Sequence, residues 1–75
     1  MKSYRDAGGD SGVSAYEYGA DWIRVQFKDN AVYEYTSSSA GQGNIDTLKS
    51  LADAGNGLNS FINKNVKKRY SQKIN

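Results

Sequence analysis

Two alternating segments joined by a short polar turn limit the possible folds of this chain more than any other feature. Across residues 22–27, Ile23, Val25 and Phe27 alternate with polar or amphipathic residues, and residues 31–36 resume the alternation after the turn. Strict alternation is typical of a β-strand that buries one face. The two segments therefore predict a β-hairpin, whose apolar face needs a second layer to cover it.

The length of the hairpin loop decides which way every side chain beyond it points. A two-residue loop would turn Glu34 toward the apolar face. A three-residue loop at 28–30, with Asn30 in the left-handed conformation, turns Tyr33 and Tyr35 inward and Glu34 outward. We expect the three-residue loop, because it suits more of the side chains. The expected cross-strand pairs are Val25 with Tyr33, Ile23 with Tyr35 and Arg24 with Glu34.

Three further segments complete the predicted secondary structure. Residues 13–18 alternate as a first strand. After a flexible connection at 37–43, an amphipathic helix spans 45–54, with Asn44 as its N-cap. A second amphipathic helix spans 57–70. Strands followed by helices predict an α+β fold, a three-stranded antiparallel β-meander followed by two α-helices packed on one face.

The ends of the chain are predicted to differ from its middle. We expect residues 1–12 to form a flexible N-terminal segment, because the glycine-rich stretch 7–12 has little to bury and much backbone freedom to lose. Only Tyr4 is expected to touch the domain. Residues 13–71 form that domain, and 72–75 form a basic tail.

Charge is distributed unevenly along the chain. Residues 1–60 hold five basic and eight acidic groups, whereas residues 61–75 hold five basic groups and no acid, so the net charges are −3 and +5. Such an end attracts phosphates and acidic surfaces. The alternative is that the charges only solvate a helix and complement its dipole. The basic residues are Lys64, Lys67, Lys68, Arg69 and Lys73.

The composition argues against several classes of protein. The chain has no Cys and no His, so the usual proton shuttle, thiol nucleophile and zinc ligands are missing. We therefore expect no enzyme activity, no metal and no cofactor. No apolar run approaches the roughly 20 residues that span a bilayer, and residues 1–5 do not lead into an apolar stretch. A cytoplasmic protein without membrane contact is the expectation.

An ordered set of residues resembles a known family. The residues that carry the resemblance are Val25-x-Phe27, Val32-Tyr33-x-Tyr35, Phe61-Ile62-Asn63-Lys64, Val66 and Arg69-Tyr70. This order resembles the KTSC domain, which is named for the C-terminal region of some lysyl-tRNA synthetases and also occurs as a stand-alone bacterial protein. The resemblance covers residues 13–71. It departs from the family at Asp29-Asn30, where Asn-Gly is usual, and at the longer connection 37–43, which lacks the usual Pro.

The resemblance implies a role with RNA or tRNA. Each aromatic residue can then either stack on a base or pack within the protein. If Trp22 stands beside Arg24 on the outer sheet face, it can stack on a base; otherwise it folds over the sheet edge. Tyr33 and Tyr35 are expected to pack in the core, with their hydroxyls hydrogen-bonded at its rim. Direct base stacking is their alternative. The motif residues expected to be structural are Tyr33, Tyr35, Phe61, Asn63 and Tyr70.

Two functional hypotheses follow. The first is a non-catalytic nucleic-acid-binding module, in which the basic residues of the second helix and Lys73 contact phosphates while Trp22 or Arg24 reaches a base. The second is a protein-interaction or dimerisation module without a nucleic-acid role. It is motivated by an outer sheet face that would expose Trp22 and Val32, because exposed apolar patches mark partner sites.

Overall fold

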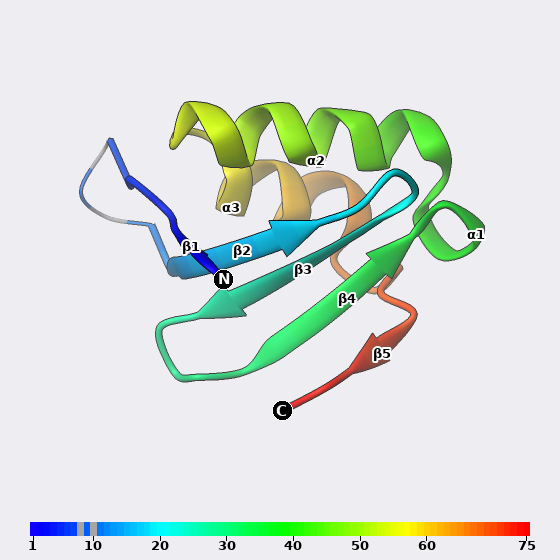
Figure 1. The fold of residues 1–75 in the computed structure, drawn as a ribbon, viewed down its shortest axis with the longest axis horizontal. Coiled ribbons are helices and arrows are strands. Elements are labelled where there is room, and N and C mark those ends of the chain that lie inside the picture. The colour runs from blue at the N-terminus through cyan, green and yellow to red at the C-terminus, as the bar shows by residue number, and fades with distance from the viewer. Residues whose placement is uncertain (8, 10) are drawn as a thin grey trace.

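The computed structural model describes residues 1–7, 9 and 11–75, which form an antiparallel sheet with helices on one face (Figure 1). The strands, in spatial order, are β1 (Lys2–Ser3), β2 (Val13–Tyr18), β3 (Trp22–Phe27), β4 (Val32–Thr36) and β5 (Gln72–Lys73). The helices are α1 (Ser37–Ala40), α2 (Gln42–Ala54), α3 (Leu58–Phe61) and the π-helical η1 (Ile62–Val66). The α+β class is as predicted, whereas the two edge strands and α1 are additional.

The predicted hairpin register is confirmed. The Phe27 N–H donates to the Ala31 carbonyl at 2.8 Å, which closes a three-residue loop, and Asn30 has φ of 71°. Asn tolerates this left-handed geometry better than most residues. The strand pairs are Val25 with Tyr33, Ile23 with Tyr35 and Arg24 with Glu34.

The core lies between the inner face of the sheet and the helices α2, α3 and η1. Ile23 and Val25 of β3 are fully buried, and so are Ile45 and Leu48 of α2. Leu58 contributes the first turn of α3 to the same cluster. The period of two in the strands and of three to four in α2 thus brings the apolar faces of the two layers together.

The N-terminal segment is attached to the domain, contrary to the flexible segment expected for residues 1–12. Lys2 and Ser3 pair with β2, and Tyr4 is 6% exposed within the core. The Leu58 N–H donates to the Tyr4 hydroxyl at 3.3 Å, and the Arg5 guanidinium donates to the Asp53 and Ala54 carbonyls at the end of α2. One buried ring and these hydrogen bonds offset the backbone entropy that predicted flexibility. Gly8 and Asp10 lie outside the described residues.

The C-terminal residues form the opposite edge of the sheet, where a basic tail was expected. Gln72 and Lys73 pair with β4 as β5. The Ile74 N–H donates to the Val32 carbonyl at 2.7 Å, and the Val32 N–H donates to Asn75 at 3.2 Å. Val32 is consequently 8% exposed, although it points away from the main core. The tail thus satisfies the free hydrogen-bonding edge of β4.

The connection after β4 is helical where the sequence predicted a flexible loop. Thr36 and Ser39 form a reciprocal capping box that starts α1. Gly41, with φ of 91°, separates α1 from α2, so α2 begins at Gln42 and not at Ile45. Asn44, expected as the N-cap, lies within α2, where its amide donates to the Ala40 carbonyl at 2.8 Å. The α2 helix ends at the left-handed Gly55, with the last residue as predicted.

The second predicted helix is shorter and less regular than expected. It begins as α3 at Leu58, widens into the π-helical η1 and ends at Val66 instead of Tyr70. Ile62 and Val66 both stay buried through the wider turns. Past Val66 the chain turns back to reach β4, because the Ser71 N–H donates to the Glu34 carbonyl at 2.6 Å. Pairing with the sheet edge thus outweighs helix continuation.

Candidate nucleic-acid interface

The basic residues of the C-terminal segment are exposed and carry uncompensated charge. Lys64 lies on η1, whereas Lys67, Lys68 and Arg69 follow it in the turn. None of these four forms an ion pair with any residue that the structure describes. Because the helix ends early, only Lys64 of the four lies on it, although the sequence analysis assigned all four to the second helix. Lys64 faces one cavity, and Lys67 and Lys68 face a second.

The second cavity, called here the aromatic cavity, opens between the sheet and the C-terminal segment. Its volume is about 320 Å³. Its lining residues are Phe27, Asp29, Ala31, Tyr33, Tyr35, Ile62, Asn63, Lys67, Lys68 and Tyr70. Aromatic rings and two lysines around one hollow suit a planar, negatively charged ligand. Asp29 places one carboxylate among them.

Three rings form a connected wall of this cavity. Phe27 and Tyr33 meet edge to face, with their centroids 5.8 Å apart. The ring centroids of Tyr33 and Tyr70 are 4.8 Å apart, and the two ring planes are tilted by 58°. The Lys73 ammonium lies 5.8 Å from the Tyr33 centroid, within cation–π range. The wall therefore combines residues from β3, β4 and the C-terminal segment, and Tyr70 is 40% exposed at its outer end.

Tyr35, a buried residue, also lines this cavity. The residue is 1% exposed, and burial raises the pKa of its phenol to about 12, with Tyr33 and Tyr70 adding to the shift. The expected hydrogen bonds of the Tyr33 and Tyr35 hydroxyls to the core rim are not made with any described residue, although no described polar side-chain atom is sealed off without a partner. The Tyr35 hydroxyl is therefore a free donor or acceptor facing the cavity.

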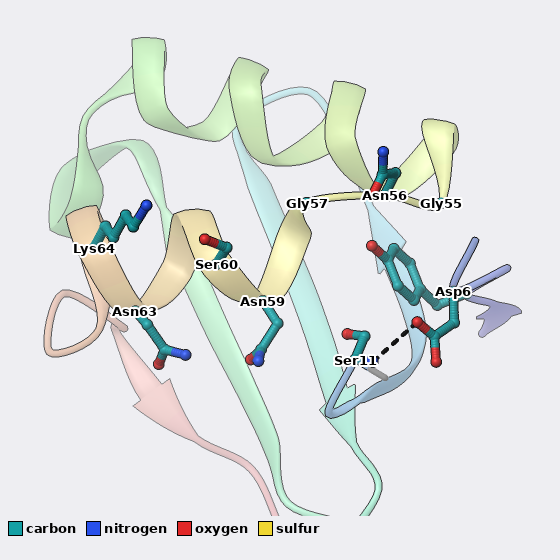
Figure 2. Close-up of a pocket in the computed structure, with 10 residues that line it drawn as sticks. Asp6, Ser11, Gly55, Asn56, Gly57, Asn59, Ser60, Asn63 and Lys64 are labelled. Atoms are coloured by element: carbon teal, nitrogen blue, oxygen red, sulfur yellow. Dashed lines mark hydrogen bonds between the residues drawn. The ribbon is translucent and has the colours of Figure 1, made fainter. Parts of the chain in front are cut away.

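The first cavity is polar and adjoins the aromatic one. It has a volume of about 450 Å³ and lies between the N-terminal segment and the α3–η1 helix (Figure 2). Asn59, Ser60, Asn63 and Lys64 line it from the helix. Asn63 also lines the aromatic cavity, so the two hollows meet across η1.

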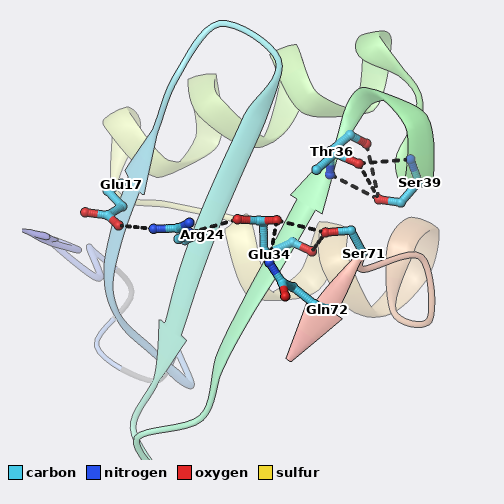
Figure 3. A network of polar contacts seen from close by, with 7 residues as sticks. All are labelled: Glu17, Arg24, Glu34, Thr36, Ser39, Ser71 and Gln72. Atoms are coloured by element: carbon cyan, nitrogen blue, oxygen red, sulfur yellow. Dashed lines mark hydrogen bonds and ion pairs between the residues drawn. The ribbon is translucent and has the colours of Figure 1, made fainter. Parts of the chain in front are cut away.

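Arg24 and Trp22 are not part of this surface. Arg24 lies on the opposite face of the sheet, between Glu17 at 3.3 Å and Glu34 at 2.9 Å (Figure 3). These hydrogen bonds, first with Glu34 and then with Glu17, raise the pKa of Arg24. The guanidinium also lies 5.0 Å from the centroid of the Trp22 ring. The structure thus separates both residues from the basic segment, with which the sequence analysis had grouped them.

The Trp22 ring lies beside Arg24, as the first interpretation required, and it also packs on the turn between β2 and β3. A Cβ added to Gly19 would collide with Trp22 Nε1, so the indole rests on the backbone of the β2–β3 turn. Val32 is covered and Trp22 is only partly exposed, so these two residues expose less apolar surface than the protein-interaction hypothesis assumed. A row of charged and polar groups crosses the outer face, from Glu17 through Arg24 and Glu34 to Ser71 and Gln72 (Figure 3).

The motif residues fall into two groups. Tyr35 is buried and Phe61 packs against the core, as expected of structural residues. Tyr33 is half-buried, while Asn63 and Tyr70 are exposed. All three line the aromatic cavity. Phe27, which the sequence analysis treated only as a core residue, belongs to the same ring wall. Its position at the end of the strand, next to the loop, was the sequence feature that could have indicated this.

Sequence reasoning missed a second polar cluster, around Asp53. The Tyr16 hydroxyl donates to Asp53 Oδ1 at 2.8 Å, and the Tyr18 hydroxyl donates to Oδ2 at 2.6 Å. These bonds, that of Tyr18 first, lower the pKa of Asp53. The shared face of the two tyrosines was visible in the alternation of residues 13–18, but their helix partner was not.

The described residues contain neither a cluster suited to a metal ion nor a helix suited to a membrane. Within residues 1–7, 9 and 11–75, no three acidic side chains gather closely enough to hold a metal ion. No helix in that part of the chain has the length and apolarity needed to cross a membrane.

Comparison with known proteins returns no relative. No family model matches the chain, and neither a curated protein nor a solved structure matches it. The resemblance to the KTSC domain therefore rests on the residues that carry it.

Proposed function

We propose that this chain is a non-catalytic nucleic-acid-binding module that contacts phosphates through its C-terminal basic segment. The observation that carries the proposal is the group of four exposed cations at 64–69, unpaired within the described structure, beside a cavity lined by aromatic rings. Cations neutralise phosphates, and aromatic rings accept bases. The KTSC resemblance makes RNA the favoured ligand.

Charge complementarity supports a polyanion over a neutral ligand. The segment from 61 to 75 carries +5, and the remainder of the chain carries −3. Carboxylates elsewhere are engaged, as Glu17 and Glu34 are with Arg24 and Asp6 is with Lys28. The positive potential is therefore concentrated at one end of the molecule, where it steers a polyanion to the surface around η1.

The test compares two variants with equal net charge. Lys67→Gln with Lys68→Gln removes two cations from the candidate surface, and Lys2→Gln with Lys28→Gln removes two from elsewhere; both lower the net charge from +2 to 0. Fluorescence anisotropy with labelled tRNA and single-stranded RNA at low and physiological salt measures binding. We expect at least a tenfold loss for the first variant and little loss for the second. Equal losses, or no binding by the wild type at low salt, would refute the proposal.

A further inference from the structure

We infer that the aromatic cavity receives a single unpaired base, so that the module reads exposed nucleotides rather than duplex. This inference rests on the proposed function and specifies its ligand. It starts from a ring wall and from Tyr35, which line the same hollow. Stacking on aromatic rings and polar contact with a base edge are the two means by which proteins hold unstacked bases.

The size of the cavity limits its occupant. At about 320 Å³ it lies at the lower end of ligand pockets, which hold roughly 300–1,000 Å³. That volume is sufficient for one nucleobase. A base in a duplex is stacked on both faces and cannot present a face to Tyr70 without leaving the helix. Recognition of loops, bulges or single strands follows.

Tyr35 supplies a polar contact inside the cavity. Its side chain is almost completely buried, but its hydroxyl bonds to no described residue and is not sealed off, so it is open to solvent. A ligand that displaces water from this hydroxyl has to take over its hydrogen bond, so a ligand atom that can donate or accept there is favoured. The carbonyl and amino groups on the edge of a nucleobase have this chemistry.

The cations around the cavity are arranged to hold the phosphates attached to such a base. Lys67 and Lys68 line the cavity itself, and Lys73 lies against the Tyr33 ring. Asp29 also lines the cavity and disfavours a second phosphate on its side. A base inserted against Tyr70 would thus carry its backbone past the lysines.

The experiment separates base contacts from phosphate contacts. The probes are a labelled single-stranded oligouridylate, an abasic strand of equal length and an RNA duplex. The variants are Tyr70→Ala, which truncates an exposed ring, and Tyr35→Phe, which removes only the hydroxyl; Tyr18→Phe is the matched control, because Tyr18 bonds to Asp53 and does not line the cavity. Thermal melting confirms that each variant is folded.

We expect the single strand to bind at least fivefold more tightly than the abasic strand or the duplex. Tyr70→Ala should weaken single-strand binding roughly tenfold, in line with the loss of one stacked base. Tyr35→Phe should weaken single-strand binding severalfold, whereas Tyr18→Phe should leave it unchanged. The affinity for the abasic strand should be the same for all of these variants. If the lysine variants lose binding but Tyr70→Ala and Tyr35→Phe do not, the base site is refuted and the proposed function stands. If no probe binds at low salt, both are refuted.

Discussion

At the residue scale, one exposed carboxylate links the end of α2 to the sheet. Asp53 accepts hydrogen bonds from two parallel tyrosines, Tyr16 and Tyr18, whose rings are 6.1 Å apart. Burial, followed by the bond to Asp53, raises the pKa of Tyr16 to about 12. The same bonds lower the pKa of Asp53 from its usual 3.8. The ionised form of Asp53 is therefore favoured by folding.

This linkage predicts a stability that depends on pH. Because the pKa of folded Asp53 lies below 3.8, its contribution is present above that value and is lost as the pH falls through the folded pKa. Asp53→Asn should lower the free energy of unfolding at neutral pH, and its stability should converge with that of the wild type in acid. Urea unfolding across pH 2–7, with Asp46→Asn as the control on the same helix, measures this. Parallel curves at every pH would contradict it.

At the element scale, the turns and helix ends show where local sequence determines conformation. Thr36 and Ser39 start α1 through their side chains, and Gly55 ends α2 in a left-handed conformation. The turn between β2 and β3 has a different constraint, because the indole of Trp22 lies on Gly19. Gly19 is therefore required for a close approach, although its φ is not in the left-handed region.

A pair of glycine substitutions tests this distinction. Gly19→Ala should destabilise the fold, because the new methyl group collides with the indole ring. Gly43→Ala should stabilise it by about 0.5–1 kcal/mol, since Gly43 lies within α2 with open space around it. Denaturant unfolding followed by the fluorescence of the single Trp22 measures both. Equal effects of the two substitutions would show that the indole does not rest on Gly19.

At the scale of the whole molecule, the two chain ends complete a sheet that the central meander leaves open. The N-terminal β1 pairs with β2 and the C-terminal β5 pairs with β4, so each inner strand gains a covered edge (Figure 1). The segment that forms β5 also brings Tyr70 and Lys73 against Tyr33. Edge protection and the aromatic cavity therefore arise from the same chain reversal after η1.

The charge distribution predicts the salt dependence of binding. If Lys64, Lys67, Lys68 and Arg69 each neutralise one phosphate, the slope of log K against log salt for a single strand is about −3. Removing Lys67 and Lys68 should reduce the slope to about −1.5. Anisotropy titrations over a range of salt concentrations provide both slopes. A slope unaltered by the double substitution would show that other cations make the phosphate contacts.

Much of the fold could be predicted, because its causes are local. The alternation in 22–27 and 31–36, with a residue at position 30 that tolerates positive φ, determined the hairpin and its register. The end of α2 at Gly55 followed from helix-capping chemistry. The end of η1 could not be predicted in this way, because it depends on hydrogen bonds between Ser71 and Glu34, which are far apart in the sequence.

The candidate surface was also predictable only in part. Its basic residues were identified from charge alone, and Tyr33, Asn63 and Tyr70 from the family resemblance, but their convergence on one cavity was not. Trp22 and Arg24 were grouped with them on residue type, although the sheet places Arg24 between two carboxylates on its other face. Residue type shows what a side chain can bind, whereas the fold decides which other side chains share its position.

The sequence by itself determined the α+β class, the inward direction of Tyr35 and the basic character of the C-terminal end, because periodicity, turn length and charge are properties of short segments. Only the tertiary structure decided that both chain ends join the sheet and that Val32 is covered. It also brought Tyr35 into the lining of one cavity with Tyr70 and two lysines. These outcomes depend on contacts between residues distant in sequence, for which no local pattern exists.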